Sequence, residues 1–379
     1  MKKINKLLIV SFSFLFVMTG CNSKDKSLFL DSDNIIKDIQ FVEEKNEKLH
    51  IDTNILPNIK NGEIFDYSYV DDKIYYIVVY DSFSEYVNDI DIYCYNIKDK
   101  NTSLIYNYHD DNINKFMCDL RATKEYLFWI DLYGDKPYWR LNKMTLADGE
   151  IDIIRKYEDS NSTSPPAISI SKNWVSWYEL PEGSEDIYTD NNLLLYSIKD
   201  DSVILLQEKV YRASPYYEAP ICDNFITYLT ANKDKTLSIN QYNLDTKETF
   251  EINTNSDIDE RYIIDYMSNG SYIVWHDGNY KTLIEPHLFV HDLKLCKTYQ
   301  FNTDNKSVLC SRIYSNYIMV KYNNHIDNNL YFYDLEGFTK INVSNYLDNE
   351  SIDWLRNSTD NYVTSQFYDK DDTGIIRIN

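Results

Sequence analysis

Residues 125–129, Glu125-Tyr126-Leu127-Phe128-Trp129, begin with a polar residue and continue as an aromatic-rich run typical of a β-strand. The same pattern recurs six more times along the chain. The seven copies begin at Lys73, Glu125, Asn173, Asn224, Ser271, Asn316 and Asn361. Their second residues are 52, 48, 51, 47, 45 and 45 positions apart. A repeat of nearly constant length indicates one structural unit used seven times.

Each unit contains further strands. A second alternating run follows each copy, as in 193–200, and a third follows the next turn, as in 203–206. With the run before each copy, every unit holds four short strands, and no helical periodicity interrupts them. Such units are typical of propeller blades, so the sequence predicts an all-β chain that forms a single β-propeller. We expect seven four-stranded blades, with six or eight as the alternatives.

The last unit reaches Asn379 after only three strands. Near the other end of the chain, residues 49–56 form an alternating run that belongs to no complete unit. We therefore expect this N-terminal strand to supply the missing outer strand of the last blade and to close the ring.

Two segments resemble a known family. Residues 170–177, Ile170-Ser171-Lys172-Asn173-Trp174-Val175-Ser176-Trp177, resemble the strand–turn–strand of TolB-type propellers, which include the amino-terminal propellers of prolyl oligopeptidase relatives. Residues 241–249 resemble the third strand, turn and fourth strand of the same family. The resemblance covers roughly residues 49–379 and implies a fold, not a function. Oligopeptidase relatives carry a hydrolase domain with a Gly-x-Ser-x-Gly motif, which this sequence lacks, so peptidase activity of that type is not expected.

The N-terminus predicts an extracytoplasmic location. Three lysines precede an apolar run over residues 7–17, which is too short to span a bilayer. The following Met18-Thr19-Gly20-Cys21 resembles the lipobox of bacterial lipoproteins. The resemblance implies cleavage after Gly20 and a diacylglyceryl group on the Cys21 sulfur, with palmitate among the expected acyl chains. We thus expect a lipid-anchored protein on the outer side of the cell membrane.

These observations divide the chain into three parts: a signal peptide over 1–20, the lipidated cysteine with a polar tether over 21–34, and the propeller over 35–379. The formal net charge is −22, from 38 Lys and Arg against 60 Asp and Glu. So acidic a surface repels phosphate, which argues against nucleic-acid partners. No Cys-x-x-Cys motif occurs, and we expect the cysteines of the mature chain to be buried in strands, with one disulfide as the alternative.

The innermost strands carry the charged residues that could form a site, because the first strand of each blade lines the central channel. Counting back from the repeated pattern predicts a layer of carboxylates, Asp119, Glu218 and Asp265, above a layer of two arginines, Arg121 and Arg312. This arrangement favours either a polar funnel for a small ligand or cation, or a water-filled channel whose charges neutralise one another. A loop containing Tyr216 and Tyr217 is predicted over the same entrance, where aromatic rings could stack on sugars or contact a partner.

Two functions follow from these features. The first is a non-enzymatic binding or scaffold module for a protein, peptide or glycan partner, since no catalytic constellation is recognisable. The second is a channel-mouth glycan hydrolase or lyase that uses Glu218 with Asp119 or Asp265 as acid and base. The sequence predicts no metal site and no cofactor. A structural calcium ion at 369–374 is the alternative, although that segment lacks the distal carboxylate of a calcium loop and favours a hairpin turn.

Overall fold

The computed structural model describes residues 27–30, 35–37, 39–45, 49–80, 89–110, 115–133, 138–157, 165–184, 186, 188–212, 218–279, 284–302, 307–323, 328–343, 351–352, 356–357, 363–369 and 372–378. The predicted signal peptide and Cys21 therefore lie outside the described residues. Within them the structure consists of strands and loops, and no helix is long and apolar enough to cross a membrane.

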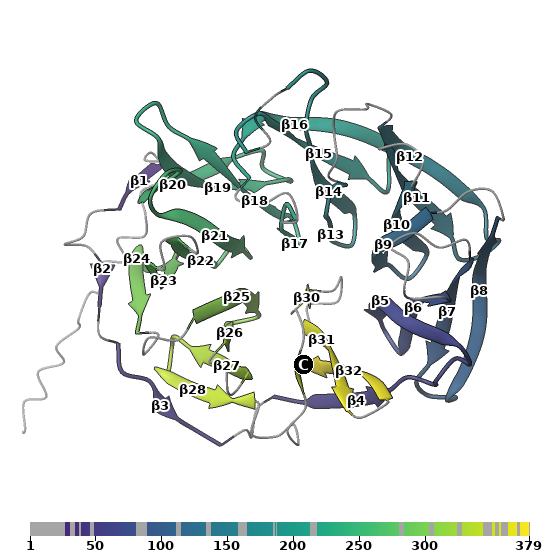
Figure 1. Cartoon of the computed structure of the whole chain (residues 1–379). Helices are drawn as coiled ribbons and strands as arrows, with labels where there is room; N and C mark the ends of the chain where they lie inside the picture. Colours follow the sequence, from purple (N-terminus) through teal and green to yellow (C-terminus); the bar gives the residue numbers. More distant parts are fainter. Residues whose placement is uncertain are drawn as a thin grey trace, which may run out of the picture.

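Seven β-sheets surround a central axis, which confirms the predicted seven-bladed propeller (Figure 1). The first three blades each contain four antiparallel strands. Blade 1 consists of β5 (Gly62–Val70), β6 (Lys73–Tyr80), β7 (Asp89–Asn96) and β8 (Asn101–His109). Blade 2 consists of β9 (Lys115–Ala122), β10 (Tyr126–Tyr133), β11 (Tyr138–Thr145) and β12 (Ile151–Tyr157). Blade 3 consists of β13 (Ile168–Ile170), β14 (Trp174–Glu179), β15 (Asn191–Ser197) and β16 (Ser202–Val210).

The next three blades have the same four antiparallel strands and a fifth, outer one from the N-terminal segment. Blade 4 consists of β17 (Ile221–Cys222), β18 (Phe225–Ala231), β19 (Thr236–Asn243) and β20 (Thr249–Asp257), with β1 (Ser27–Phe29) outside. Blade 5 consists of β21 (Tyr262–Ser268), β22 (Tyr272–Asn279), β23 (Ile284–Asp292) and β24 (Lys297–Phe301), with β2 (Ile35–Ile36) outside. Blade 6 consists of β25 (Ser307–Tyr314), β26 (Tyr317–Asn323), β27 (Asn328–Asp334) and β28 (Thr339–Asn342), with β3 (Val42–Glu43) outside.

Blade 7 joins the two ends of the chain. Its C-terminal strands are β29 (Ser351–Ile352), β30 (Arg356–Asn357), β31 (Val363–Asp369) and β32 (Asp372–Ile378), and its outer strand is β4 (Ile51–Ile55). The β4 strand runs antiparallel to β32, with Thr53 opposite Ile376. The prediction that residues 49–56 close the ring is therefore confirmed. The β31–β32 hairpin, in which Asp369 pairs with Asp372, also confirms a hairpin at 369–374.

The strands β1 to β4 form an N-terminal belt that follows the outer edges of blades 4, 5, 6 and 7 in turn (Figure 1). An outer edge carries unpaired N–H and C=O groups, and an added strand satisfies them. The first three belt strands pair in parallel with β20, β24 and β28. Apolar side chains secure the belt between blades, since Phe41 packs 4.9 Å from the rings of both Phe301 and Tyr333.

The belt corrects the predicted tether over 21–34. Residues 27–30 of that segment lie on blade 4, where the Leu30 N–H donates a 2.9 Å hydrogen bond to the Asn253 carbonyl oxygen. The Leu30 side chain is only 7% exposed and joins a buried cluster with Leu237 and Ile252. Burial of an apolar side chain such as Leu30 against a blade is favourable, and it holds this segment on the propeller. The propeller therefore begins before residue 35.

The core is divided among the boundaries between blades. Each boundary holds one cluster of buried side chains, seven among the described residues. Trp129, Trp177 and Trp275 occupy equivalent positions in three second strands and are fully buried, which explains the aromatic repeat. Cys94 and Cys310 are buried free thiols in strands, as expected, whereas the free thiols of Cys118 and Cys222 are only partly buried. Cys296 lies in the turn between β23 and β24 and is disulfide-bonded.

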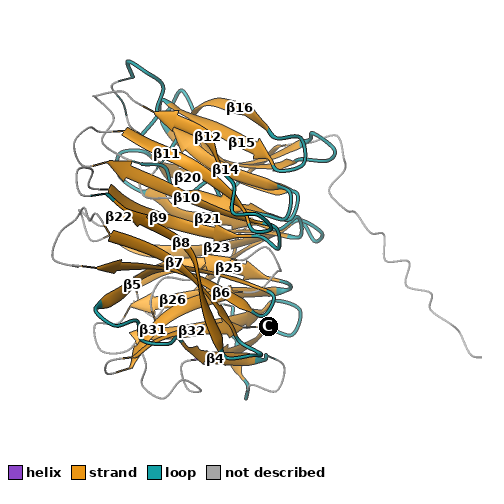
Figure 2. Cartoon of the chain, turned by 90° about the vertical axis from the view of Figure 1, so that its right-hand side faces the viewer, coloured by secondary structure: helices purple, strands orange, loops and turns teal. Residues whose placement is uncertain are grey.

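The side view shows the blades as tilted strands stacked around the ring, with loops at both faces (Figure 2). Strand order within each blade places its first strand nearest the axis. The inner strands β9, β17, β21 and β25, which carry or adjoin the predicted charged residues, accordingly surround the centre (Figure 1).

Candidate functional site

The predicted charged residues do come together at the inner strands. Asp119 and Arg121 lie on β9 of blade 2, and Arg121 Nη2 is 3.0 Å from Asp119 Oδ1. The same Nη2 lies 3.4 Å from Glu218 Oε2, on the segment that precedes β17 of blade 4. Arg121 thus joins a carboxylate of its own strand to one from two blades further along the chain.

Arg312 forms the second half of this network. It lies on β25 of blade 6, is 4% exposed at its side chain, and donates from Nη1 to Asp265 Oδ2 at 2.7 Å. Its Nη2 lies 3.5 Å from Glu218 Oε1. Burial on its own lowers the pKa of Arg312, but Asp265 and Glu218 outweigh this and raise it above the ordinary value. Arg312 is therefore charged at any physiological pH.

We call this arrangement the inner charge chain, in the order Asp119, Arg121, Glu218, Arg312 and Asp265. It links blades 2, 4, 6 and 5 by hydrogen-bonded ion pairs instead of forming two separate layers of opposite charge. Glu218 is the central member and the most exposed, at 22% of its side chain. Tyr216 and Tyr217, which were predicted to lie over the channel entrance, are outside the described residues.

The inner aspartates also bind the backbone of the next blade. Asp119 Oδ2 accepts a 2.8 Å hydrogen bond from the Ile168 N–H, and Asp265 Oδ2 accepts a 3.1 Å bond from the Ser311 N–H. Asp66 in blade 1 does the same for Leu120 in blade 2, at 2.9 Å. Asp66 is a residue that sequence reasoning missed. These carboxylates therefore contribute to cohesion between blades.

A second buried polar contact also lies near the axis. The hydroxyls of Tyr178 on β14 and Tyr266 on β21 are 2.7 Å apart, which joins blade 3 to blade 5. The Arg212 guanidinium lies 5.6 Å from the centre of the Tyr178 ring. Burial lowers the pKa of Arg212 to about 10, against the opposing effect of the two tyrosines. The Arg212 side chain is itself buried.

His276 lies beside the inner charge chain, opposite Asp265 in the β21–β22 register. Its side chain is fully buried, and neither ring nitrogen has a hydrogen-bond partner among the described residues. Burial lowers its pKa to about 4, although Asp265 and Asp277 oppose that shift. The imidazole is therefore neutral at pH 7. In the described part of the chain, no group of three His, Cys, Asp or Glu side chains is arranged to hold a metal ion.

Comparison with known proteins identifies the fold. The sequence matches no protein-family model and no curated protein. Among solved structures, a prolyl endopeptidase gives a TM-score of 0.58 at 8% identity over 81% of this chain, which spans only 46% of that protein. The propeller domain of the trilobed protease from Pyrococcus furiosus gives 0.56 at 11% identity, over 82% of this chain and 91% of that one. An oligogalacturonate lyase in complex with manganese gives 0.52 at 8% identity, over 81% and 86%.

These similarities are structural and show a β-propeller. The trilobed-protease domain is described as having an open velcro topology. In the present chain, by contrast, β4 and β32 pair over five residues and close blade 7. The chain thus shares its architecture with propellers attached to peptidases and with one that belongs to a lyase.

Proposed function

We propose that this chain is a non-catalytic binding or scaffold propeller for a protein, peptide or glycan partner, held outside a bacterial plasma membrane by lipid on Cys21. The observation that supports it best is the complete engagement of the inner carboxylates. Both oxygens of Glu218 face arginines, and those of Asp119 and Asp265 accept from arginine and from backbone N–H groups.

Engagement of this kind is poorly suited to acid–base chemistry. A general base needs an oxygen within hydrogen-bond reach of the substrate proton, and a general acid needs a proton to donate. In the inner charge chain, each carboxylate oxygen already accepts a hydrogen bond from the protein. The same groups join neighbouring blades, which gives them a structural role that needs no substrate.

A glycan hydrolase or lyase is the second candidate. The structural similarity to an oligogalacturonate lyase supports this second candidate, because that protein is a lyase and the match covers 86% of its chain. Glu218 is the residue on which this activity would depend in the present chain. Its two contacts, at 3.4 and 3.5 Å, are longer than the 2.7 Å contact of Asp265, so it is the carboxylate that a ligand would displace most readily.

Activity assays with Glu218→Gln distinguish the two candidates. The purified chain is incubated with neutral and acidic oligosaccharides, and products are followed by reducing-end assay and mass spectrometry. We expect no turnover by the native chain or by Glu218→Gln. Turnover that disappears in Glu218→Gln but persists in Glu182→Gln, a matched change at an exposed loop glutamate, would overturn the binding proposal.

The anchor is tested separately. The belt begins at Ser27, so only five residues separate Cys21 from blade 4, and they span at most about 20 Å. A lipid on Cys21 would therefore hold the rim of blade 4 close to the membrane. We expect the mature protein to fractionate with membranes and to carry the mass of a lipidated N-terminal cysteine, and we expect Cys21→Ser to release it. Membrane association that survives Cys21→Ser would contradict the anchor.

A further inference from the structure

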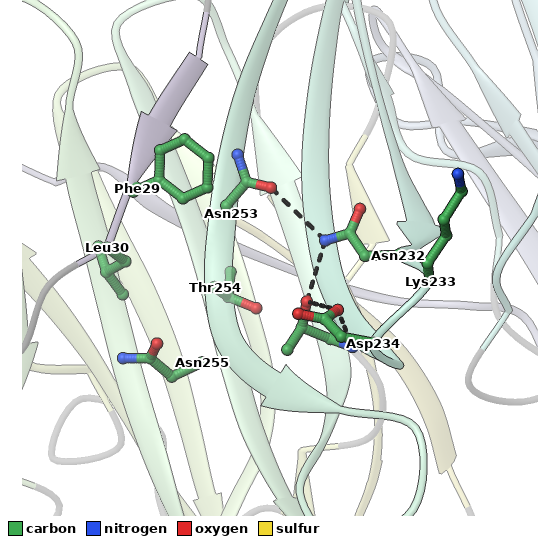
Figure 3. A pocket seen from close by; sticks show the side chains of 9 residues that line it. Phe29, Leu30, Asn232, Lys233, Asp234, Asn253, Thr254 and Asn255 are labelled. Atoms are coloured by element: carbon green, nitrogen blue, oxygen red, sulfur yellow. Dashed lines mark hydrogen bonds between the residues drawn. The ribbon is translucent and has the colours of Figure 1, made fainter.

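A pocket lies where the belt meets the outer edge of blade 4. Figure 3 shows the side chains that line it. Its volume of about 530 Å³ falls within the range of ligand pockets, about 300–1,000 Å³. The belt contributes one wall, and blade 4 contributes the turn between β18 and β19 together with β20. The lining residues are Phe29, Leu30, Asn232, Lys233, Asp234, Thr236, Asn253, Thr254 and Asn255.

The belt wall presents an aromatic ring to solvent. Phe29 pairs in register with Asn253 and is 74% exposed, whereas the next residue, Leu30, is buried against the blade. Figure 3 shows the Phe29 ring beside the Asn253 amide at the edge of the pocket. Because Leu30 and its backbone hydrogen bond fix the strand, Phe29 is held in place at little further entropic cost.

The opposite wall is rich in side-chain amides with fixed orientations. Asn232 donates from Nδ2 to Thr236 Oγ1 and Ser238 Oγ, both at 3.0 Å, and lies 3.5 Å from Asn253 Oδ1. Asn253 Oδ1 also accepts a 2.9 Å bond from Ser238. These bonds use the nitrogen of Asn232 and the oxygen of Asn253. Within the described part of the chain, the Asn232 side-chain oxygen and the Asn253 side-chain nitrogen make no such bond, so both can face a ligand.

A carboxylate and a third amide complete the polar lining. Thr236 donates to Asp234 Oδ1 from its backbone N–H at 3.1 Å and from its hydroxyl at 2.7 Å. These bonds lower the pKa of Asp234, so the carboxylate is ionised at neutral pH and its Oδ2 can accept from a ligand. The exposed Asn255 presents a whole amide, with a donor and an acceptor side by side.

The chemistry of the lining selects one class of ligand. Paired amide donors and acceptors match vicinal hydroxyl or acetamido groups, and an exposed aromatic face packs against the apolar C–H face of a sugar ring. Lys233 and Asp234 contribute opposite charges to the lining, while the chain as a whole carries −22. An acidic oligosaccharide would therefore be repelled, and a neutral one would not.

We propose that this pocket binds a neutral saccharide, with Phe29 as the stacking platform and Asn232, Asn253 and Asn255 as the hydrogen-bonding groups. The proposal rests on the proposed function, since it names the glycan that such a binding module would take. It also gives the belt a role in binding, because the pocket exists only while β1 lies on blade 4.

Calorimetric titration with two neutral trisaccharides, cellotriose and tri-N-acetylchitotriose, tests the proposal. We expect the intact chain to bind at least one of them, and Phe29→Ala and Asn255→Ala each to weaken binding by about tenfold or more. Both side chains are exposed, so both variants should fold, and thermal unfolding confirms this. Phe338→Ala, at a half-exposed phenylalanine in a turn of blade 6, serves as the matched control and should bind like the native chain.

Three results would separate the possibilities. Binding that is unchanged in Phe29→Ala and Asn255→Ala would overturn the pocket assignment but not the proposed binding function. Failure of the intact chain to bind either sugar would have the same consequence. Cleavage of the bound trisaccharide, detected by mass spectrometry of the recovered ligand, would overturn the non-catalytic function itself.

Discussion

Arg312 donates a 2.7 Å hydrogen bond to Asp265 across the boundary between blades 6 and 5. Asp265 also accepts from the Tyr266 and Ser311 N–H groups, and Arg312 extends to Glu218 from blade 4. A single pair of side chains thus unites three blades at the axis. This relationship gives the acidic and basic residues in the interior of the ring a structural role.

Loss of this pair should be strongly destabilising. Asp265→Ala leaves the buried Arg312 guanidinium with its 2.8 Å hydrogen bond to the Ser311 carbonyl oxygen and, as an anionic partner, only the more distant Glu218 among the described residues. Removing one partner of a buried ion pair costs about 3–5 kcal/mol. We expect the urea midpoint to fall accordingly. Lys98→Ala, which breaks a solvent-exposed pair with Asp72, should leave the urea midpoint nearly unchanged. Equal effects of the two substitutions would refute a structural role for the inner charge chain.

Closure of the ring, and with it the stability of the propeller, should depend on β4 much more than on β1. A chain that begins at residue 34 loses β1 but keeps β4, and we expect its Tm to fall by less than about 5 °C. A chain that begins at residue 57 loses β2 and β3 as well as β4 and its contact between Asp52 and Arg377, and the loss of β4 opens blade 7. That chain should lose at least about 10 °C or fail to fold. Calorimetry of the two truncated proteins gives the comparison, and similar Tm values would be inconsistent with closure through β4.

Stability should fall as the pH falls from about 6.5 to about 4. Burial lowers the pKa values of His276 and His291 to about 4 in the folded chain, against 6.5 for an ordinary histidine. Across that window the unfolded chain binds protons that the folded chain does not, so acid favours unfolding by roughly 3 kcal/mol per histidine. Unfolding measured at pH 7, 6, 5 and 4 should show this slope, and His276→Gln should reduce it. An unchanged slope in that variant would exclude His276 as its source.

The hydrogen-bonded hydroxyls of Tyr178 and Tyr266 should contribute less to the free energy of unfolding than the Arg312–Asp265 pair. Tyr178→Phe leaves the Tyr266 hydroxyl buried without its 2.7 Å partner, at a cost of about 1–3 kcal/mol. Tyr188→Phe, at an exposed tyrosine, should be within about 0.5 kcal/mol of the native chain. Chemical unfolding provides both values. A Tyr178→Phe variant as stable as the native chain would show that the contact contributes nothing.

The architecture was predictable because short sequence patterns specify its strands. The aromatic repeat marked each second strand, and its tryptophans pack between blades, as Trp129 does. The closing strand was predictable because residues 49–56 contain an alternating run that belongs to no complete unit. The first three belt strands were not, since each is only two or three residues long and pairs only because a finished blade offers a free edge.

The charged site was predictable in its members but not in its geometry. Counting from the repeats found Asp119 and Asp265, but each inner strand that carries such an aspartate contains a β-bulge, which shifts the register. Asp66 was missed because it lies eight residues before Ile74, the second residue of its repeat, whereas Asp119 and Asp265 lie seven residues before theirs. Pairing between side chains from different blades, such as Arg121 with Glu218, depends on ring closure and has no local signal in the sequence.

The location of the binding surface can be measured directly by hydrogen–deuterium exchange with and without a neutral trisaccharide. We expect added protection at residues 27–30, 231–236 and 253–255, where the belt meets blade 4, and no change in the inner strands β9 and β25. Protection that appears instead in β9 and β25 would place the ligand at the channel and contradict a structural inner ring with a binding site on its rim.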